Sequence, residues 1–128
     1  TLDSPAFDPP GTKGFPVRAA ILPALDFVNS IGIENVVKRC RYLSDYLKKG
    51  LNEIKGVRLL SGSNKYISAP GSTIFEKENL DAMEAVPMME KRINTHIDEH
   101  QRDGHNAIRV STHIYNTKKQ IDRLLNAL

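Results

Sequence analysis

Arg109 is the residue whose type and setting point most directly to chemistry. It stands in an apolar, β-branched run over residues 107–114, and an arginine is rarely buried there without an anionic partner. A guanidinium fixed on a strand can bind a carboxylate or a phosphate through two parallel hydrogen bonds. In an extended strand its side chain points away from Ile108 and Val110, and so faces outward if they face the core. Two interpretations stay open: an anion clamp, or a solvated surface arginine, with no anionic partner identified inside this chain.

A short turn, Gly11-Thr12-Lys13-Gly14, offers a second group suited to an anion. Free backbone N–H groups together with a threonine hydroxyl suit a phosphate. The turn lacks the spacing of a P-loop, and two glycines around two polar residues are also typical of an ordinary loop. The pattern alone does not decide between a phosphate contact and a plain turn.

Histidine and cysteine give weaker signals. The stretch from His96 to His100 formally matches the H-x-x-E-H pattern of zinc peptidases, which requires both histidines on one helix face. The flanking residues instead alternate as in a strand, where the two histidines would stand roughly 13 Å apart, too far for one zinc ion. Cys40 lies in the apolar stripe of a helix, which is typical of a small buried residue and not of a nucleophile. We therefore predict no metal site.

The overall composition excludes several classes of function. The 128 residues carry a net charge of +3, with 40% hydrophobic and 26% charged residues, as in an ordinary globular domain. Lysine and arginine alternate with acidic residues and form no basic block, which argues against a nucleic-acid partner. We see no leader peptide and no apolar run as long as a membrane span, and the single cysteine fits a reducing compartment. We therefore expect a cytoplasmic protein without a membrane partner.

Apolar spacing predicts the helices that would position these groups. The clearest spans residues 34–54, with the polar side formed by Lys38, Arg41, Asp45, Lys48, Lys49 and Glu53. An earlier helix over residues 17–31 should be kinked or displaced by Pro23 and closed by Gly32. A capping box, Thr117 to Gln120, opens a last helix whose apolar face is formed by Ile121, Leu124, Leu125 and Leu128.

Strands are predicted over residues 57–60, 72–76, 93–100 and 107–114. A short helix between the second and third strands should be capped by Asn79 or Asp81 and limited by Pro87. Gly104 indicates a hairpin-like reversal between the last two strands. This order predicts an α+β fold: a two-layer sandwich with a mainly antiparallel sheet of about three or four strands and helices packed on one face.

Two stretches resemble a known family. Residues 109–117, Arg-Val-Ser-Thr-His-Ile-Tyr-Asn-Thr, followed by Ile-Asp-Arg-Leu-Leu at 121–125, closely resemble the C-terminal end of class V aminotransferases. These are fold-type I pyridoxal-phosphate enzymes and include cysteine desulfurases, selenocysteine lyases and isopenicillin N epimerase-like proteins. Residues 7–13 resemble the family's phenylalanine and glycine-threonine motif, and residues 24–27 the helix that follows it. The resemblance covers the whole chain in the right order.

The resemblance implies roles for three residues. Arg109 matches the arginine that binds the substrate α-carboxylate. Gly11 and Thr12 match the motif that contacts the cofactor phosphate, with Thr12 reaching across a homodimer into the neighbouring active site. The family's Schiff-base lysine, its aspartate at the pyridine nitrogen and its ring-stacking histidine lie in a large α/β domain that this sequence lacks. No catalytic residue is therefore assigned here.

The resemblance also implies a domain organisation and a function. We expect residues 1–16 to be an interdomain linker, and residues 17–128 to be the C-terminal small domain of an enzyme acting on an amino acid. Alone, the chain is expected to be inactive and not to bind pyridoxal phosphate. Desulfurases carry a catalytic cysteine just before the arginine strand. Residues 100–108 contain none, which disfavours persulfide chemistry and leaves an aminotransferase, an epimerase or a C–S/C–N lyase. The alternative is a stand-alone, non-catalytic α+β interaction module.

Overall fold

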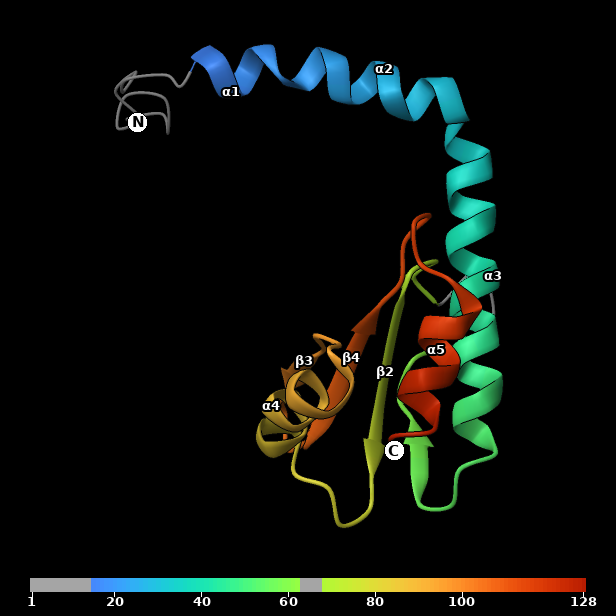
Figure 1. The fold of residues 1–128 in the computed structure, drawn as a ribbon, viewed down its shortest axis with the longest axis vertical. Coiled ribbons are helices and arrows are strands. Elements are labelled where there is room, and N and C mark those ends of the chain that lie inside the picture. The colour runs from blue at the N-terminus through green and yellow to red at the C-terminus, as the bar shows by residue number, and fades with distance from the viewer. Residues whose placement is uncertain (1–14, 63–67) are drawn as a thin grey trace, which may run out of the picture. The chain divides into compact units, whose positions relative to one another are not determined.

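The computed structural model describes residues 15–62 and 68–128 and has the predicted α+β architecture (Figure 1). Its four-stranded sheet has the order β1-β2-β4-β3, and every neighbouring pair is antiparallel. Along the chain, the elements are α1 (Phe15–Ala19), α2 (Ile21–Ile31), α3 (Ile33–Asn52), β1 (Val57–Leu59), β2 (Ser72–Lys77), α4 (Ala82–Ile93), β3 (Asp98–His100), β4 (Ala107–Ser111) and α5 (Lys118–Leu125).

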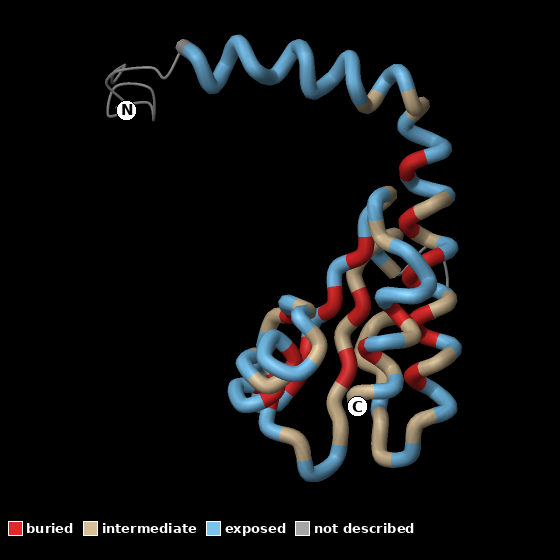
Figure 2. The backbone as a smooth tube through the Cα atoms, in the orientation of Figure 1, coloured by how far each residue is buried: buried red, intermediate tan, exposed pale blue. Residues whose placement is uncertain are grey.

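The core lies between one face of the sheet and helices α3, α4 and α5, as Figure 2 shows by its buried segments. Phe75 of β2 and Ile108 of β4 stand opposite each other in the register, and both are almost completely buried. Ser44 of α3 hydrogen-bonds to Thr73 of β2 at 3.0 Å, which pairs two polar side chains inside the core. Helices therefore cover one face, as predicted, and the other face of the sheet carries mostly polar side chains, together with Ile74 and Ala107.

The chain divides into two compact units at Ile33. In the first unit the predicted helix over residues 17–31 is broken at Ala20, and α2 begins afresh at Ile21. Pro23 explains the break, because its ring excludes a continuous helix through the preceding turn. Gly32 closes α2 with a φ of 86°, and its N–H donates to the carbonyls of Val28 and Asn29. The predicted domain boundary at residues 16–17 is not tested by this division.

Two predictions around α4 are wrong. Pro87 does not limit the helix, which continues to Ile93. Pro87 lacks the N–H that would donate to the Met83 carbonyl, and both residues lie on the exposed side of the helix, outside the core. The predicted strand over residues 93–100 is reduced to Asp98–His100, because Asn94 takes a left-handed conformation (φ 47°) that closes the helix. The alternation of Ile93, Thr95 and Ile97 therefore spans a helix end and not a strand.

The predicted place of Lys48 on the polar side of the long helix is also wrong. Lys48 is 7% exposed, and its ammonium group donates to the Gly62 carbonyl at 3.0 Å and to the Ser68 hydroxyl at 2.5 Å. Periodicity misplaces it because a long lysine stem can lie along apolar surface while its charged end finds oxygen partners.

Local hydrogen bonds fix the ends of α4 and α5. Asp81 caps α4 by accepting from the N–H groups of Met83 (2.8 Å) and Glu84 (3.3 Å). Of the two predicted caps, Asp81 is therefore the one used. The capping box of α5 is confirmed: Thr117 accepts from the Gln120 N–H at 3.3 Å, and the Gln120 side chain accepts from the Thr117 N–H at 2.9 Å.

Thr117→Ala is expected to destabilise the protein by about 1 kcal/mol, because the Gln120 N–H loses its side-chain acceptor and keeps only its 3.1 Å bond to the Thr117 carbonyl. Urea unfolding followed by circular dichroism measures the change. Thr117→Ser keeps the hydroxyl and serves as the control, with an expected loss well below that of alanine. Equal losses in the two variants would show that the threonine methyl group, and not the cap, is responsible.

Within the described ranges, no single helix is both long and apolar enough to cross a membrane. The helices Pro16–Ile31 and Ile33–Asn52 meet that test only together, as a broken pair.

Candidate functional site

Arg109 lies on the face of the sheet that the helices leave open. Its neighbours on β4, Ile108 and Val110, are 1% and 7% exposed and face the core, whereas the Arg109 side chain is 45% exposed. The predicted outward orientation is therefore confirmed. In the register, Arg109 stands between Ile74 of β2 and Asp98 of β3.

Asp98 is the anionic partner of Arg109, which the alternation of residues along the strand did not predict. The Arg109 Nη2 group donates to Asp98 Oδ2 at 2.8 Å. Among the described residues, Asp98 is the hydrogen-bond partner of this guanidinium, and one of its five N–H donors is engaged. The expectation of an arginine without a partner inside the chain is therefore wrong.

The turn between β3 and β4 explains why these two residues meet. Asp103 and Gly104 both have positive φ values, 54° and 80°, at the centre of the connection. Paired positive φ values are typical of the tight turns that join antiparallel strands, and Asp-Gly is a favoured pair there. Asp98 lies as far before this turn as Arg109 lies after it, so the hairpin register places them opposite each other.

A row of neighbouring ionisable side chains leads from Asp98 to α4. His96 Nδ1 lies 2.6 Å from Glu90 Oε1, and His96 Nε2 lies 3.6 Å from Asp98 Oδ1. The hydrogen bond to Glu90 is the main cause that raises the pKa of His96, while the hydrogen bond from Arg109 lowers the pKa of Asp98. All of these side chains are substantially exposed, so solvent screening weakens their interactions.

We expect the pKa of His96 to lie above its ordinary value of 6.5 in the folded protein. Its stabilising contribution is then complete below the pKa of the unfolded chain and is lost as the pH rises through the higher folded value. An NMR titration of the His96 ring measures this pKa. Glu90→Gln should lower it towards 6.5, whereas Glu84→Gln, on the same helix, should not. A His96 pKa at or below 6.5 in the unsubstituted protein would contradict the assignment.

A second ion-pair cluster occupies the same open face beside β1. Arg58 donates to Glu76 Oε2 through Nε at 2.9 Å and also through Nη2, and His105 Nδ1 lies 2.8 Å from Glu76 Oε1. These contacts lower the pKa of Glu76, with the hydrogen bond from Arg58 as the largest cause. Both oxygens of this carboxylate are therefore occupied.

Other residues singled out in the sequence are not brought to Arg109. Gly11 and Thr12, the predicted phosphate contacts, lie outside the described residues. His96 precedes β3 and pairs with Glu90, so the prediction that His96 and His100 share a strand is wrong. Cys40 is 5% exposed on α3, a small buried side chain as predicted. In the part of the chain that the structure describes, no group of three or more His, Cys, Asp or Glu side chains is arranged to hold a metal ion.

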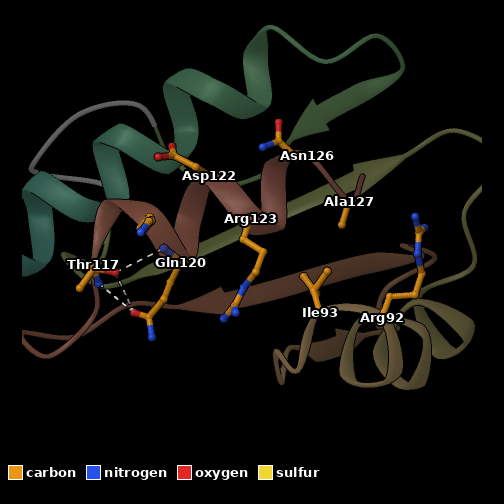
Figure 3. A pocket seen from close by; sticks show the side chains of 9 residues that line it. Arg92, Ile93, Thr117, Gln120, Asp122, Arg123, Asn126 and Ala127 are labelled. Carbon is orange, nitrogen blue, oxygen red and sulfur yellow. Dashed lines mark hydrogen bonds between the residues drawn. The ribbon is translucent and has the colours of Figure 1, made fainter.

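A concavity of about 760 Å³ lies where the end of α4 meets α5, away from Arg109 (Figure 3). Arg123 extends from α5 into this space, and Arg92 and Ile93 of α4 border it. Asp122 also borders it, but its carboxylate accepts a hydrogen bond of 2.6 Å from the Tyr46 hydroxyl on α3. No predicted site residue lines this concavity.

Comparison with solved structures agrees with this fold. A cysteine desulfurase from Thermococcus onnurineus NA1 superposes with a TM-score of 0.81 at 17% identity, over 98% of this chain and 33% of that one. A cystine C–S lyase gives 0.74 at 24% identity, over 91% and 29%. An alanine–glyoxylate aminotransferase from Nostoc sp. gives 0.71 at 20% identity, over 98% and 33%. At these identities the likeness establishes the fold.

Sequence comparison gives a more specific relationship. A probable cysteine desulfurase from Synechocystis sp. is 28% identical over 126 residues, which covers 92% of this chain and 30% of that protein. The chain thus spans about a third of the length of the relatives it matches. The family model of class-V aminotransferases matches residues 10–124, almost the whole sequence, so the chain belongs to the class-V aminotransferase family.

Proposed function

We propose that this chain is the C-terminal part of a pyridoxal-phosphate enzyme that acts on an amino acid. Residues 1–16 would form the linker from a large domain, and residues 17–128 the small domain. The family match over residues 10–124, together with coverage of about a third of the relatives, supports this organisation.

The main support for the proposal is the position of the Arg109 guanidinium, which is exposed on the open face of the sheet. The side chain is 45% exposed, and a single described hydrogen bond engages it, so most of its donors are available to a ligand. Its planar fork matches a carboxylate, the group common to all α-amino acids. In this proposal, Arg109 binds and orients the substrate α-carboxylate.

The described residues supply a group for the substrate but not the proposed contacts of the cofactor. Gly11 and Thr12 are proposed to contact the phosphate across a homodimer interface, and both lie outside the described residues. When bound, pyridoxal phosphate supplies the electron-withdrawing ring that makes the bonds at the substrate Cα labile. The part played by this chain is to hold the carboxylate end of the substrate in one place.

Within its own compact unit, α2 presents an apolar surface that a neighbour would cover. No residue of α2 is buried, and four large side chains are exposed by half or more: Ile21, Leu22, Leu25 and Phe27. A soluble helix normally buries such residues, and contiguous exposed apolar surface marks an interaction site. In the proposed enzyme the large domain or the second subunit covers them.

The choice of reaction is also a proposal. The connection between β3 and β4, from Gln101 to Asn106, contains no cysteine that could carry a persulfide. We therefore favour transamination, epimerisation or C–S/C–N bond cleavage over persulfide formation, although several relatives carry the desulfurase name.

Purification of the intact protein that contains this chain tests the proposal. Mass spectrometry should identify about one pyridoxal phosphate per subunit. A panel of amino acids, with a 2-oxo acid added as acceptor of the amino group, should then give a new keto acid on transamination, inversion at Cα on epimerisation, or sulfide or ammonia on elimination. A protein that binds no cofactor and converts no amino acid would instead be the non-catalytic interaction module.

A further inference from the structure

We propose that Asp98 is a positioning residue that holds the Arg109 guanidinium ready for the substrate carboxylate. This inference rests on the carboxylate-binding role proposed for Arg109. It concerns a residue that acts through Arg109 and does not itself contact the substrate.

The two side chains are fixed by the register of a hairpin. Asp98 and Arg109 stand directly opposite each other in the β3–β4 pair, which are neighbours at one edge of the sheet (Figure 1). Their side chains are 44% and 45% exposed, and the distance from Nη2 to Oδ2 is 2.8 Å. A free arginine side chain loses considerable rotamer entropy when it is immobilised on binding. The hydrogen bond to Asp98 imposes that order before the ligand arrives.

Asp98 is itself supported from the side away from Arg109. Its Oδ1 faces His96 Nε2 at 3.6 Å, and the other nitrogen of His96 is held by Glu90 of α4 at 2.6 Å. One carboxylate oxygen therefore faces His96 while the other accepts from Arg109. A row of side chains thus runs from α4 to the guanidinium, which favours a defined orientation of the Asp98 carboxylate.

Arg58, on the same open face, differs from Arg109 in how many of its guanidinium nitrogens donate to a carboxylate. Two nitrogens of Arg58, Nε and Nη2, donate to the same oxygen of Glu76. Arg109 contacts Asp98 through Nη2 alone. The Nε and Nη1 donors of Arg109, and the second hydrogen of Nη2, have no partner among the described residues. Asp98 therefore fixes the position of this guanidinium and leaves a pair of N–H donors for a second carboxylate.

The test uses the intact enzyme and glycine, which carries the α-carboxylate and no side chain, with glycine methyl ester as the probe that lacks the carboxylate. Isothermal titration calorimetry measures the Kd of both for the unsubstituted enzyme, Asp98→Ala, Asp98→Asn, Arg109→Lys and Asp98→Ala/Arg109→Lys. Glu99→Ala is the matched control, because Glu99 is the next residue of β3 and its side chain points to the opposite face. Thermal unfolding of each variant checks that it is folded.

Asp98→Ala should raise the Kd of glycine about 2–10-fold, because Arg109 must then be ordered on binding. Asp98→Asn, which keeps an oxygen acceptor, should restore most of the affinity, and Glu99→Ala should leave it unchanged. In the Arg109→Lys background, Asp98→Ala should add little, since its effect passes through the guanidinium. Binding of the methyl ester should be insensitive to every substitution.

Three results would overturn the inference while leaving the role of Arg109 intact. These are unchanged glycine affinity in Asp98→Ala, tighter binding in both Asp98 variants, and equal weakening of the methyl ester. Tighter binding would show that Asp98 competes with the ligand, and loss of ester binding would show a general structural effect. If Arg109→Lys itself leaves glycine affinity unchanged, or if the unsubstituted enzyme does not bind glycine, the proposed function fails first.

Discussion

Arg109→Lys is expected to lower kcat/KM of the intact enzyme for its amino-acid substrate by about 10–100-fold. Lysine keeps the positive charge but loses the planar fork that can donate two parallel hydrogen bonds to a carboxylate. It also loses the Nη2 group that Asp98 now holds. Steady-state kinetics with the substrate found in the amino-acid panel measures the effect.

Arg58→Lys provides the matched control for this experiment. Arg58 lies on the same face of the same sheet, but two of its nitrogens are already bonded to Glu76. We expect its kcat/KM to stay within about 2-fold of the unsubstituted enzyme, because a surface ion pair contributes little. Equal losses of kcat/KM in the two variants would mean that activity does not depend specifically on carboxylate binding by the Arg109 guanidinium.

Phe75→Ala is expected to reduce the free energy of unfolding by about 3–5 kcal/mol. Phe75 is completely buried on the helix-facing side of β2, next to Ile108 of β4 and in the same core as Leu43 of α3. Removing its ring leaves a cavity bounded by both layers of the sandwich. Urea unfolding of the protein followed by circular dichroism measures the loss.

A substitution of the neighbouring residue, Ile74, distinguishes the loss of core packing from the loss of strand propensity. Ile74→Ala removes a β-branched side chain from the open face, where Ile74 is half-buried beside Arg109. Its expected cost is less than half that of Phe75→Ala, since a partly exposed side chain buries less apolar surface. Similar costs would indicate that the open face of the sheet is covered in solution.

Features that depend on neighbouring residues could be predicted from the sequence. The apolar stripe of α3, the Gly32 cap and the Thr117 capping box each use contacts within a few residues, and all three are confirmed. The outward orientation of Arg109 follows equally from the alternation of a strand. The fold class then follows from the order of the elements.

The errors arise where distant contacts decide the outcome. Lys48 is buried because the Gly62 carbonyl and the Ser68 hydroxyl accept from its ammonium group. Pro87 is tolerated because it lies on the exposed side of α4, and which side of the helix is exposed depends on how α4 packs against the rest of the fold. The partner of Arg109 is a different case. The Asp103–Gly104 turn fixes the register, and counting outward from that turn along both strands leads to Asp98 from the sequence alone.

The strand order also constrains how the chain folds. The β3–β4 pair needs only the turn at Asp103–Gly104, whereas pairing β4 with β2 must close a loop from Glu78 to Asn106. Closing a longer loop costs more entropy, and non-local pairing is slow. Helix α4 lies within that loop and carries its own caps at Asp81 and Asn94, so its early formation would shorten the distance to be searched. We therefore expect the central β2–β4 ladder, which includes Arg109, to form after the β3–β4 hairpin.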